Sequence, residues 1–549
     1  MRWIRTISAE TEEGAETLGG KARGLVLLHR LGLRVPDGFV VTTEACRAFL
    51  RDGRLPDGLD AELTAAVAGL ERSTGRVFGG SRKPLAVSVR SGARVSMPGM
   101  MNTILNLGLT TGATTGLTAE TGDGTFALDS RLRFLSGFAA AVTEADGAGA
   151  AQGRDPVPVN EGGEARLREA AKAVEDFVRE RCGRPVPDDA TRQLEWAVEA
   201  VFSSWNTPRS RTYRALNDIP HDLGTAVIVQ TMVFGNRDEH SGTGVAFSRD
   251  PNTGENIPYG EVLFGHQGED VVSGSSTTRP LRELGEREPA VWRELLDALG
   301  RIEKHHRDAC YVEFTFDSGE LWFLQVRTGR FVGGAAVRVA TELVDERVIG
   351  REEALFRISP QHLRHVRTPR VASSGEADIF ARGIGACPGA AVGRVATTAD
   401  SAVRMARDAP VILVRPETSP ADLHGLAAAA GVVTARGGPA SHAAVVARAM
   451  SKPAVVGVSG LTVDTDNGTG TDTGTGSVAV AGRTIGEGTL VTIDGTSGEI
   501  ALGRLHIVAN AADDHLDRLL GWADDISGDH SVREESRRLE AARAVLRRR

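Results

Sequence analysis

The sequence is poor in aromatic residues, and it contains no long apolar run. Aromatic residues make up 5% of its 549 residues, so a core must be built mainly from Ala, Val and Leu with close packing at Gly. No apolar run approaches the ~20 residues of a membrane-spanning helix. Glu10, Glu12 and Glu13 are incompatible with a secretory signal. We therefore expect a cytoplasmic protein that does not bind a membrane.

Cysteine and positive charge are also limited. The formal net charge is −8, which argues against nucleic acid as the main partner. The four cysteines, Cys46, Cys182, Cys310 and Cys387, lie far apart, without the spacing of a zinc or redox site. We expect them to be free thiols.

The length predicts several domains, since one domain takes roughly 150 residues. Residues 1–335 alternate strand-like runs such as 39–42 and 226–229 with helical patterns at 165–181 and 191–205, which predicts an α/β or α+β region. Residues 336–378 combine a helical pattern with Pro360, Pro369 and Ser373-Ser374-Gly375, which predicts an interdomain linker.

A second domain is predicted at 379–505 from its Val- and Ile-rich strands. Its low-complexity stretch 464–477 is rich in Asp, Gly and Thr. A mobile hairpin extension is favoured there over a calcium loop, because the bidentate glutamate is missing. Residues 506–549 are predicted to be a linker and a basic helical tail. We expect a solvated helix end, and a docking helix stays open.

A histidine in a Gly-rich segment carries the clearest chemical signal. Residues 437–447 read Gly-Gly-Pro-Ala-Ser-His-Ala-Ala-Val-Val-Ala and predict a turn that leads into a helix, after a strand at 431–434. Backbone N–H groups at a helix start disfavour an imidazolium and can bind a phosphoryl group. His442 is therefore a candidate phosphate-carrying nucleophile. The alternative is a histidine that only caps or packs the helix.

Segments of the first region suit a nucleotide, although each alone is compatible with a surface charge or a turn. Lys21 follows a Gly-Gly pair, Arg90 follows a strand, and Gly242 and Gly244 could form a backbone cradle for phosphate. The Gly/Pro-hinged loop 96–101 could fold over a ligand. Two strands joined by an Asp-Ser-Gly turn carry oxygens suited to Mg²⁺ and a cation suited to phosphate, namely Glu313, Gln325 and Arg327.

Together, these motifs resemble those of the pyruvate, phosphate dikinase family in order and spacing. The similar strings include SVRSGARVSMPGMMNTILNLGL at 88–109, VQTMVFGNRDEHSGTGVAFSRDPNTG at 229–254, VILVRPETSP at 411–420 and the His442 segment. The resemblance covers roughly residues 15–525. It implies a multidomain α/β and α+β protein, with an ATP-grasp-type nucleotide-binding domain at 1–335 and a swivelling β/β/α phosphohistidine domain at 379–505.

The resemblance also implies residue roles. Lys21, Arg90 and Arg327, with the backbone at Gly242 and Gly244, are expected to bind ATP. Glu313 and Gln325 are expected to bind Mg²⁺. His442 is expected to accept phosphate from ATP, with inorganic phosphate taking the γ group, so that AMP and pyrophosphate leave.

The sequence departs from the family pattern at three points. Tyr311 stands where the family usually has an acidic residue, so we expect weaker metal or nucleotide binding and a gain in phosphorylation from Tyr311→Asp. Pro439-Ala440 replaces Met-Thr, which removes the threonine that regulatory proteins modify in some members. The family's C-terminal barrel, which binds pyruvate or phosphoenolpyruvate, does not follow residue 525, so we expect only the ATP and histidine half of the reaction.

Three functions follow as hypotheses. In the first, the chain performs this half-reaction and the barrel is a separate protein or is lost. In the second, the same chemistry delivers phosphate to another small molecule, as in rifampicin phosphotransferases. In the third, the protein binds a nucleotide without turnover, which the Tyr311 departure favours and the retained candidate residues oppose.

Overall fold

The computed structural model divides the chain into two compact units. One contains Met1–Ser241 and Thr315–Val326, and the other contains Gly242–Phe314 and Arg327–Arg549. All four cysteines are free, as predicted. The residues described are 3–95, 97, 100–145, 163–273, 278–329, 331, 333–364, 366, 370–371, 378–465, 476–508 and 514–548. Within these ranges no helix combines the length and the apolar character needed to cross a membrane.

The first unit is built on a five-stranded sheet whose paired strands are antiparallel. The order is β1 (Ile4–Thr6), β2 (Gly38–Val41), β7 (Ala226–Thr231), β5 (Val87–Gly92) and β6 (Thr103–Leu107). A short pair, β3 (Val77–Phe78) and β4 (Pro84–Leu85), is parallel.

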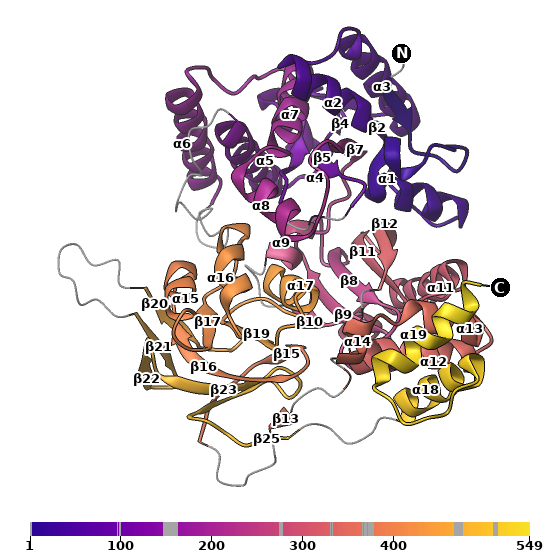
Figure 1. The fold of residues 1–549 in the computed structure, drawn as a ribbon. Coiled ribbons are helices and arrows are strands. Elements are labelled where there is room, and N and C mark those ends of the chain that lie inside the picture. Colours follow the sequence, from indigo (N-terminus) through magenta and orange to yellow (C-terminus); the bar gives the residue numbers. More distant parts are fainter. Residues whose placement is uncertain are drawn as a thin grey trace. The chain divides into compact units, whose positions relative to one another are not determined.

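Helices lie around this sheet, and several of them share its apolar core (Figure 1). Helix α7 shows why they form: Leu194, Ala197, Val198 and Val201 recur at helical spacing and are all buried, and the Asp189 side chain caps the first turn. The predicted strands at 39–42 and 226–229 and the predicted helices at 165–181 and 191–205 are confirmed. The helices are α1 (Ala15–Arg30), α2 (Thr43–Asp52), α3 (Leu59–Thr74), α4 (Thr111–Thr121), α5 (Gly124–Ala145), α6 (Glu164–Cys182), α7 (Ala190–Ser204) and α8 (Pro208–Leu216).

A second five-stranded sheet has the order β10 (Arg279–Pro280), β9 (Tyr259–Phe264), β8 (Gly242–Phe247), β11 (Cys310–Asp317) and β12 (Glu320–Thr328). Ser318 and Gly319 turn the chain between the last two strands with positive φ angles, as the Asp-Ser-Gly motif predicts. Three helices belong to the same stretch of chain: α9 (Gly268–Ser273), α10 (Glu283–Arg287) and α11 (Pro289–His306).

Five helices from two distant stretches of the second unit share one hydrophobic core (Figure 1). They are α12 (Gly333–Asp345), α13 (Arg351–Arg357), α14 (Pro360–Arg364), α18 (Asp514–Ser527) and α19 (Glu535–Leu546). The expectation of a solvated tail is wrong, because Leu539 and Ala542 of α19 are fully buried and Arg543 donates to the Leu355 carbonyl at 3.0 Å. Pro369 and residues 373–375 of the predicted linker lie outside the described residues.

The chain then forms an eight-stranded mixed sheet. Its order is β14 (Ile379–Arg382), β24 (Glu499–Leu502), β23 (Leu490–Asp494), β16 (Ala390–Ala396), β17 (Val411–Arg415), β18 (Gly431–Thr434), β19 (Ala454–Val456) and β15 (Ile384–Cys387). The strands from β16 to β19 are parallel, and the helices that follow them are α15 (Ala399–Met405), α16 (Leu423–Ala428) and α17 (His442–Ala449).

Two smaller sheets complete the second unit. One contains β20 (Thr462–Asp464), β21 (Ser477–Val480) and β22 (Arg483–Gly486), and the other pairs β13 (Arg370–Val371) with β25 (Ile507–Val508). Residues 466–475, where the mobile extension was predicted, lie outside the described residues. The chain is thus a multidomain mixed α/β protein. The ATP-grasp assignment, the swivelling arrangement and the domain boundaries stay predictions.

Candidate functional site

His442 lies where a parallel strand leads into a helix. β18 ends at Thr434, a turn follows, and α17 begins at His442, which confirms the predicted strand, turn and helix. Gly437 in the turn has a φ of 93°, in the region that favours glycine. The Ser441 hydroxyl accepts a hydrogen bond from the Ala444 amide at 3.5 Å and caps the helix. The imidazole therefore stands at the positive end of α17.

The two ring nitrogens of His442 have different surroundings. Nδ1 lies 3.1 Å from Thr418 Oγ1, within hydrogen-bond distance. Nε2 is buried, and no hydrogen-bond partner for it occurs among the described residues. When Nδ1 carries the proton and donates it to Thr418, the lone pair is on Nε2. Nε2 is then the nitrogen available for a phosphoryl group.

The His442 imidazole is held in its neutral form. Burial lowers its pKa to about 4, and the carboxylate of Asp422 opposes this shift. A neutral imidazole keeps the lone pair that nucleophilic attack requires. At neutral pH the side chain therefore keeps this lone pair.

The residues beside His442 come from the segment after β17, the parallel neighbour of β18. Asp422 lies 3.3 Å from Arg415 Nε, and its carboxylate accepts the Ser419 amide at 2.8 Å. No role was predicted for Thr418 or Asp422. A usable signal existed, because the carboxyl ends of neighbouring parallel strands meet at one edge of a sheet.

Two buried charges hold the loop that precedes His442. Glu261 of β9 accepts the Ala440 amide at 3.0 Å, and burial raises the pKa of its carboxyl group. Arg448 of α17 donates to the carbonyls of Pro439 and Ala386. A Cβ at Gly438 would lie 1.4 Å from Glu261 Oε1, so this glycine is required by the close approach. Neither side chain was predictable, because its partners are backbone atoms, most of them remote in sequence.

Tyr311, Glu313 and Arg327 form a contact cluster on β11 and β12. The Tyr311 hydroxyl donates to Glu313 Oε1 at 3.3 Å, and the Arg327 guanidinium carbon lies 4.1 Å from the centre of the Tyr311 ring. Arg327, the candidate for phosphate binding, and Glu313, the candidate metal ligand, thus both contact Tyr311.

The predicted glycine cradle differs from the structure. Gly242 and Gly244 lie inside β8, an interior strand of its sheet, rather than in a loop. A Cβ at Gly244 would lie 2.5 Å from the Phe314 ring. Backbone N–H and C=O groups of an interior strand are used in hydrogen bonds to the strands on both sides. These glycines allow close packing, and their predicted ATP contact gains no support from this geometry.

In the first unit, Lys21 follows a sharp kink in α1. Gly19 at the kink has a φ of 75°, and a Cβ there would lie 1.6 Å from the Gly92 carbonyl oxygen of β5. The Gly20 amide donates to the Ala93 carbonyl at 2.9 Å. The Gly-Gly pair thus brings Lys21, at the start of the second helical segment, beside the end of β5. A turn before the lysine was predicted, and the kink confirms it.

Arg90 and Gln325 are buried polar residues of the same unit, 9% and 7% exposed. Arg90 donates to the Gln230 side chain and to the Leu324 carbonyl, the latter at 3.1 Å. These bonds orient its guanidinium. Arg90 lies inside β5, paired with Ile228 and Thr103, so the expectation that it follows a strand is wrong. Of the predicted ligand-covering loop at 96–101, Ser96, Pro98 and Gly99 lie outside the described residues.

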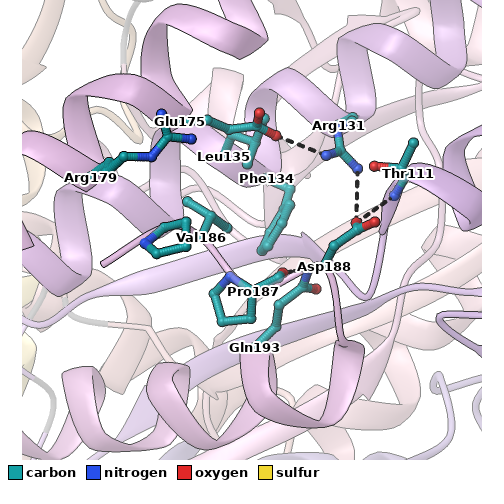
Figure 2. A pocket seen from close by; sticks show the side chains of 11 residues that line it. Thr111, Arg131, Phe134, Leu135, Glu175, Arg179, Val186, Pro187, Asp188 and Gln193 are labelled. Carbon is teal, nitrogen blue, oxygen red and sulfur yellow. Dashed lines mark hydrogen bonds and ion pairs between the residues drawn. The ribbon is translucent and has the colours of Figure 1, made fainter. Parts of the chain in front are cut away.

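A cavity of about 150 Å³ lies elsewhere in the first unit, and no predicted site residue lines it (Figure 2). Arg131 in its wall lies 2.8 Å from Glu175 and 3.9 Å from Asp188, and Asp188 also accepts the Thr111 amide. Arg131 is thus paired with both carboxylates that line the cavity.

The chain matches two described families. Residues 15–68 and 50–282, two overlapping stretches, match the pyruvate phosphate dikinase AMP/ATP-binding domain. Residues 407–498, which include His442, match the mobile domain of PEP-utilising enzymes. Because the second match is to PEP-utilising enzymes, it does not support the expectation that the phosphoenolpyruvate-binding part is absent. It also does not support the expectation of a separate barrel protein.

Curated relatives are similar over most of the chain. It is 39% identical over 548 residues to a pyruvate, phosphate dikinase of Rhizobium meliloti, which covers 95% of this chain and 60% of the relative. It is 41% identical over 522 residues to pyruvate, phosphate dikinase 2 of Zea mays, which covers 93% and 58%. A pyruvate, phosphate dikinase of Clostridium symbiosum is 39% identical over 535 residues, with 95% and 60% covered. The chain thus spans 58–60% of these relatives' lengths.

Proposed function

Because the comparisons support the pyruvate, phosphate dikinase family for this chain, we propose that it uses MgATP and inorganic phosphate to phosphorylate its own His442. The observation that carries this proposal is the His442 ring itself. Its pKa is lowered to about 4 by burial, its Nδ1 contacts Thr418, and its Nε2 has no described partner. These are the properties of a nitrogen nucleophile that is ready to accept a phosphoryl group.

In the proposed reaction, the Nε2 lone pair attacks the β-phosphorus of ATP. A phosphorus–nitrogen bond forms, and the bond from the β-phosphorus to the oxygen bridging it to the α-phosphate breaks, so that AMP leaves. An oxygen of inorganic phosphate then attacks the γ-phosphorus, and the bond from the γ-phosphorus to the oxygen bridging it to the β-phosphorus breaks. Pyrophosphate leaves, and the β-phosphoryl group stays on Nε2. The imidazole gains positive charge during the attack, and the Nδ1 proton stays hydrogen-bonded to Thr418.

The remaining candidates bind and orient the nucleotide. We assign Lys21, Arg90 and Arg327 to the phosphate oxygens, where cations offset the charge that develops in the transfer. Lys21 and Arg90 belong to the first unit, and Arg327 to the second. Catalysis then rests on positioning and electrostatics.

We assign Glu313 and Gln325 as the protein ligands of Mg²⁺. Among the described residues no group of three or more His, Cys, Asp or Glu side chains could hold a metal ion. One carboxylate and one amide oxygen fit an ion that usually keeps waters and substrate phosphates as its other ligands. When bound, Mg²⁺ would neutralise phosphate charge.

The proposal stops at phosphorylated His442. Pyruvate appears in the names of the relatives, and the chain spans 58–60% of their lengths. The residues assigned here account for the ATP and histidine half of the chemistry. The proposal does not include the final acceptor of the phosphoryl group.

Isotopic labelling tests the proposed reaction. With Mg²⁺ and inorganic phosphate present, ATP labelled at the β-phosphorus should give an acid-labile, base-stable adduct on His442, and γ-labelled ATP should give none. His442→Ala should lose the label and still bind ATP. His424→Ala, which changes a surface histidine of the same sheet region, is the matched control and should keep it. Label in His442→Ala would refute the assignment, and label from the γ position would refute the order of bond breaking.

A further inference from the structure

Tyr311 occupies an unusual place beside two candidate site residues. It is one of three tyrosines in the sequence, is 2% exposed and lies in β11. Its ring packs edge-on against Phe247, with centroids 4.9 Å apart. The ring is thereby fixed in a small apolar cluster with Val245 and Leu263. A side chain held so firmly can in turn fix what touches it.

The Tyr311 hydroxyl reaches Glu313 along the same face of the strand. Residues two apart in a strand point to the same side, and the hydroxyl donates to Glu313 Oε1 at 3.3 Å. A carboxylate can only accept a hydrogen bond, so the phenol is the donor. One Glu313 oxygen is thereby oriented, and the other is left for a cation.

The face of the same ring supports Arg327. The guanidinium carbon lies 4.1 Å from the ring centre, within the range of a cation–π contact. Stacking restricts the side-chain freedom of an arginine without using its N–H donors. These donors stay available for phosphate oxygens.

We propose that Tyr311 is a positioning residue that orients Glu313 for Mg²⁺ and Arg327 for the nucleotide phosphates. This inference rests on the proposed function, because it takes the roles of Glu313 and Arg327 from it. It reverses the expectation that Tyr311→Asp increases phosphorylation. A carboxylate at this buried position would repel Glu313 and offer Arg327 no ring, so the variant should be phosphorylated more slowly than the wild type.

Tyr311→Phe is the informative variant, because it keeps the ring and removes only the hydroxyl. We expect the Mg²⁺ concentration for half-maximal labelling of His442 to rise about threefold to tenfold, as the loss of one hydrogen bond to a carboxylate predicts. The KM for ATP at saturating Mg²⁺ should stay nearly unchanged. Tyr311→Leu, which also removes the ring, should raise this KM as well. Tyr259→Phe removes a hydroxyl at the edge of the same apolar cluster and should change neither value.

The possible results separate this inference from the function beneath it. If the wild type is labelled and Tyr311→Phe has the same Mg²⁺ dependence, the positioning role is refuted and the proposed function stands. If all variants lose labelling in proportion to a lower melting temperature, Tyr311 is only a packing residue and the inference again fails. Absence of labelling and of calorimetric MgATP binding in the wild type would refute the proposed function itself.

Discussion

The pKa of His442 makes a prediction about a single residue. Because burial lowers this pKa to about 4, the imidazole should stay neutral at pH values where a free histidine, with a pKa of about 6.5, is protonated. The sign of the linked stability follows. Between these two values the unfolded chain takes up a proton that the folded chain does not, so folding should weaken as the pH falls through this window.

Diethylpyrocarbonate reacts with neutral imidazole and measures this pKa directly. We expect the rate of His442 modification, followed by peptide mass spectrometry, to lose half its value near pH 4. A histidine peptide added to the same reaction serves as the reference and should do so near pH 6.5. A common midpoint for the two would contradict the neutral, buried state of His442.

Sequence motifs located His442 at its helix start and missed the residues that contact it and its loop. His442 was predictable because the turn and the helix start are encoded within a dozen adjacent residues. Thr418 and Glu261 lie 24 and 179 positions away from the atoms that they contact, and hydrogen bonds over such separations leave no local pattern. Tyr311 was noticed only as a departure from a pattern. Its contacts with Glu313 and Arg327 became visible only in the structure.

At the scale of elements, one buried arginine joins a strand to two helices. Arg249 follows β8, its side chain has no exposed surface, and it lies 2.7 Å from Glu303 of α11 and 2.6 Å from Glu346, which directly follows α12. Glu342 of α12 lies 3.2 Å away. Removing this cation would leave carboxylates close to one another in a partly buried space, which is costly.

Arg249→Met should therefore lower the free energy of unfolding by about 3–5 kcal/mol. The measurement is denaturant unfolding followed by circular dichroism. Arg301→Ala on α11 removes an exposed arginine, 3.3 Å from Asp297, and should cost less than about 1 kcal/mol. Equal effects of the two substitutions would show that the Arg249 cluster contributes no more than a surface pair.

Elements were predictable where local periodicity decides them. α7 and the β18–α17 unit follow their apolar spacing, turn glycines and caps. α19 was misjudged because its fate depends on a partner surface, formed by α12 to α14, that lies far away in the sequence. The strand position of Gly242 and Gly244 was not predicted, since glycine serves tight packing in a strand as well as turns.

At the scale of the whole molecule, the candidate residues divide between the two units. Lys21, Arg90 and Gln325 belong to the first, whereas Glu313, Arg327 and His442 belong to the second. The sequence could not show this division, because the first unit is discontinuous. It contains residues 315–326, which follow a segment of the second unit in the chain. If the proposed function is right, one reaction draws on residues of both units, and loss of a phosphate-binding cation from either unit should slow it.

The reverse reaction offers the sharpest test of this dependence. By microscopic reversibility, AMP and pyrophosphate should remove the label from phosphorylated His442 and form ATP, with the same cations stabilising the same charges. Lys21→Met should slow both directions, each by about tenfold or more, because one charged contact to a phosphate is lost. Lys83→Met, which changes an exposed lysine of the same unit, is the control and should slow neither. A Lys21→Met protein that exchanges label at the wild-type rate would remove the first unit's lysine from the reaction. A slowed reaction with an unchanged melting temperature would assign Lys21 to the nucleotide chemistry. A folding defect would lower both the rate and the melting temperature.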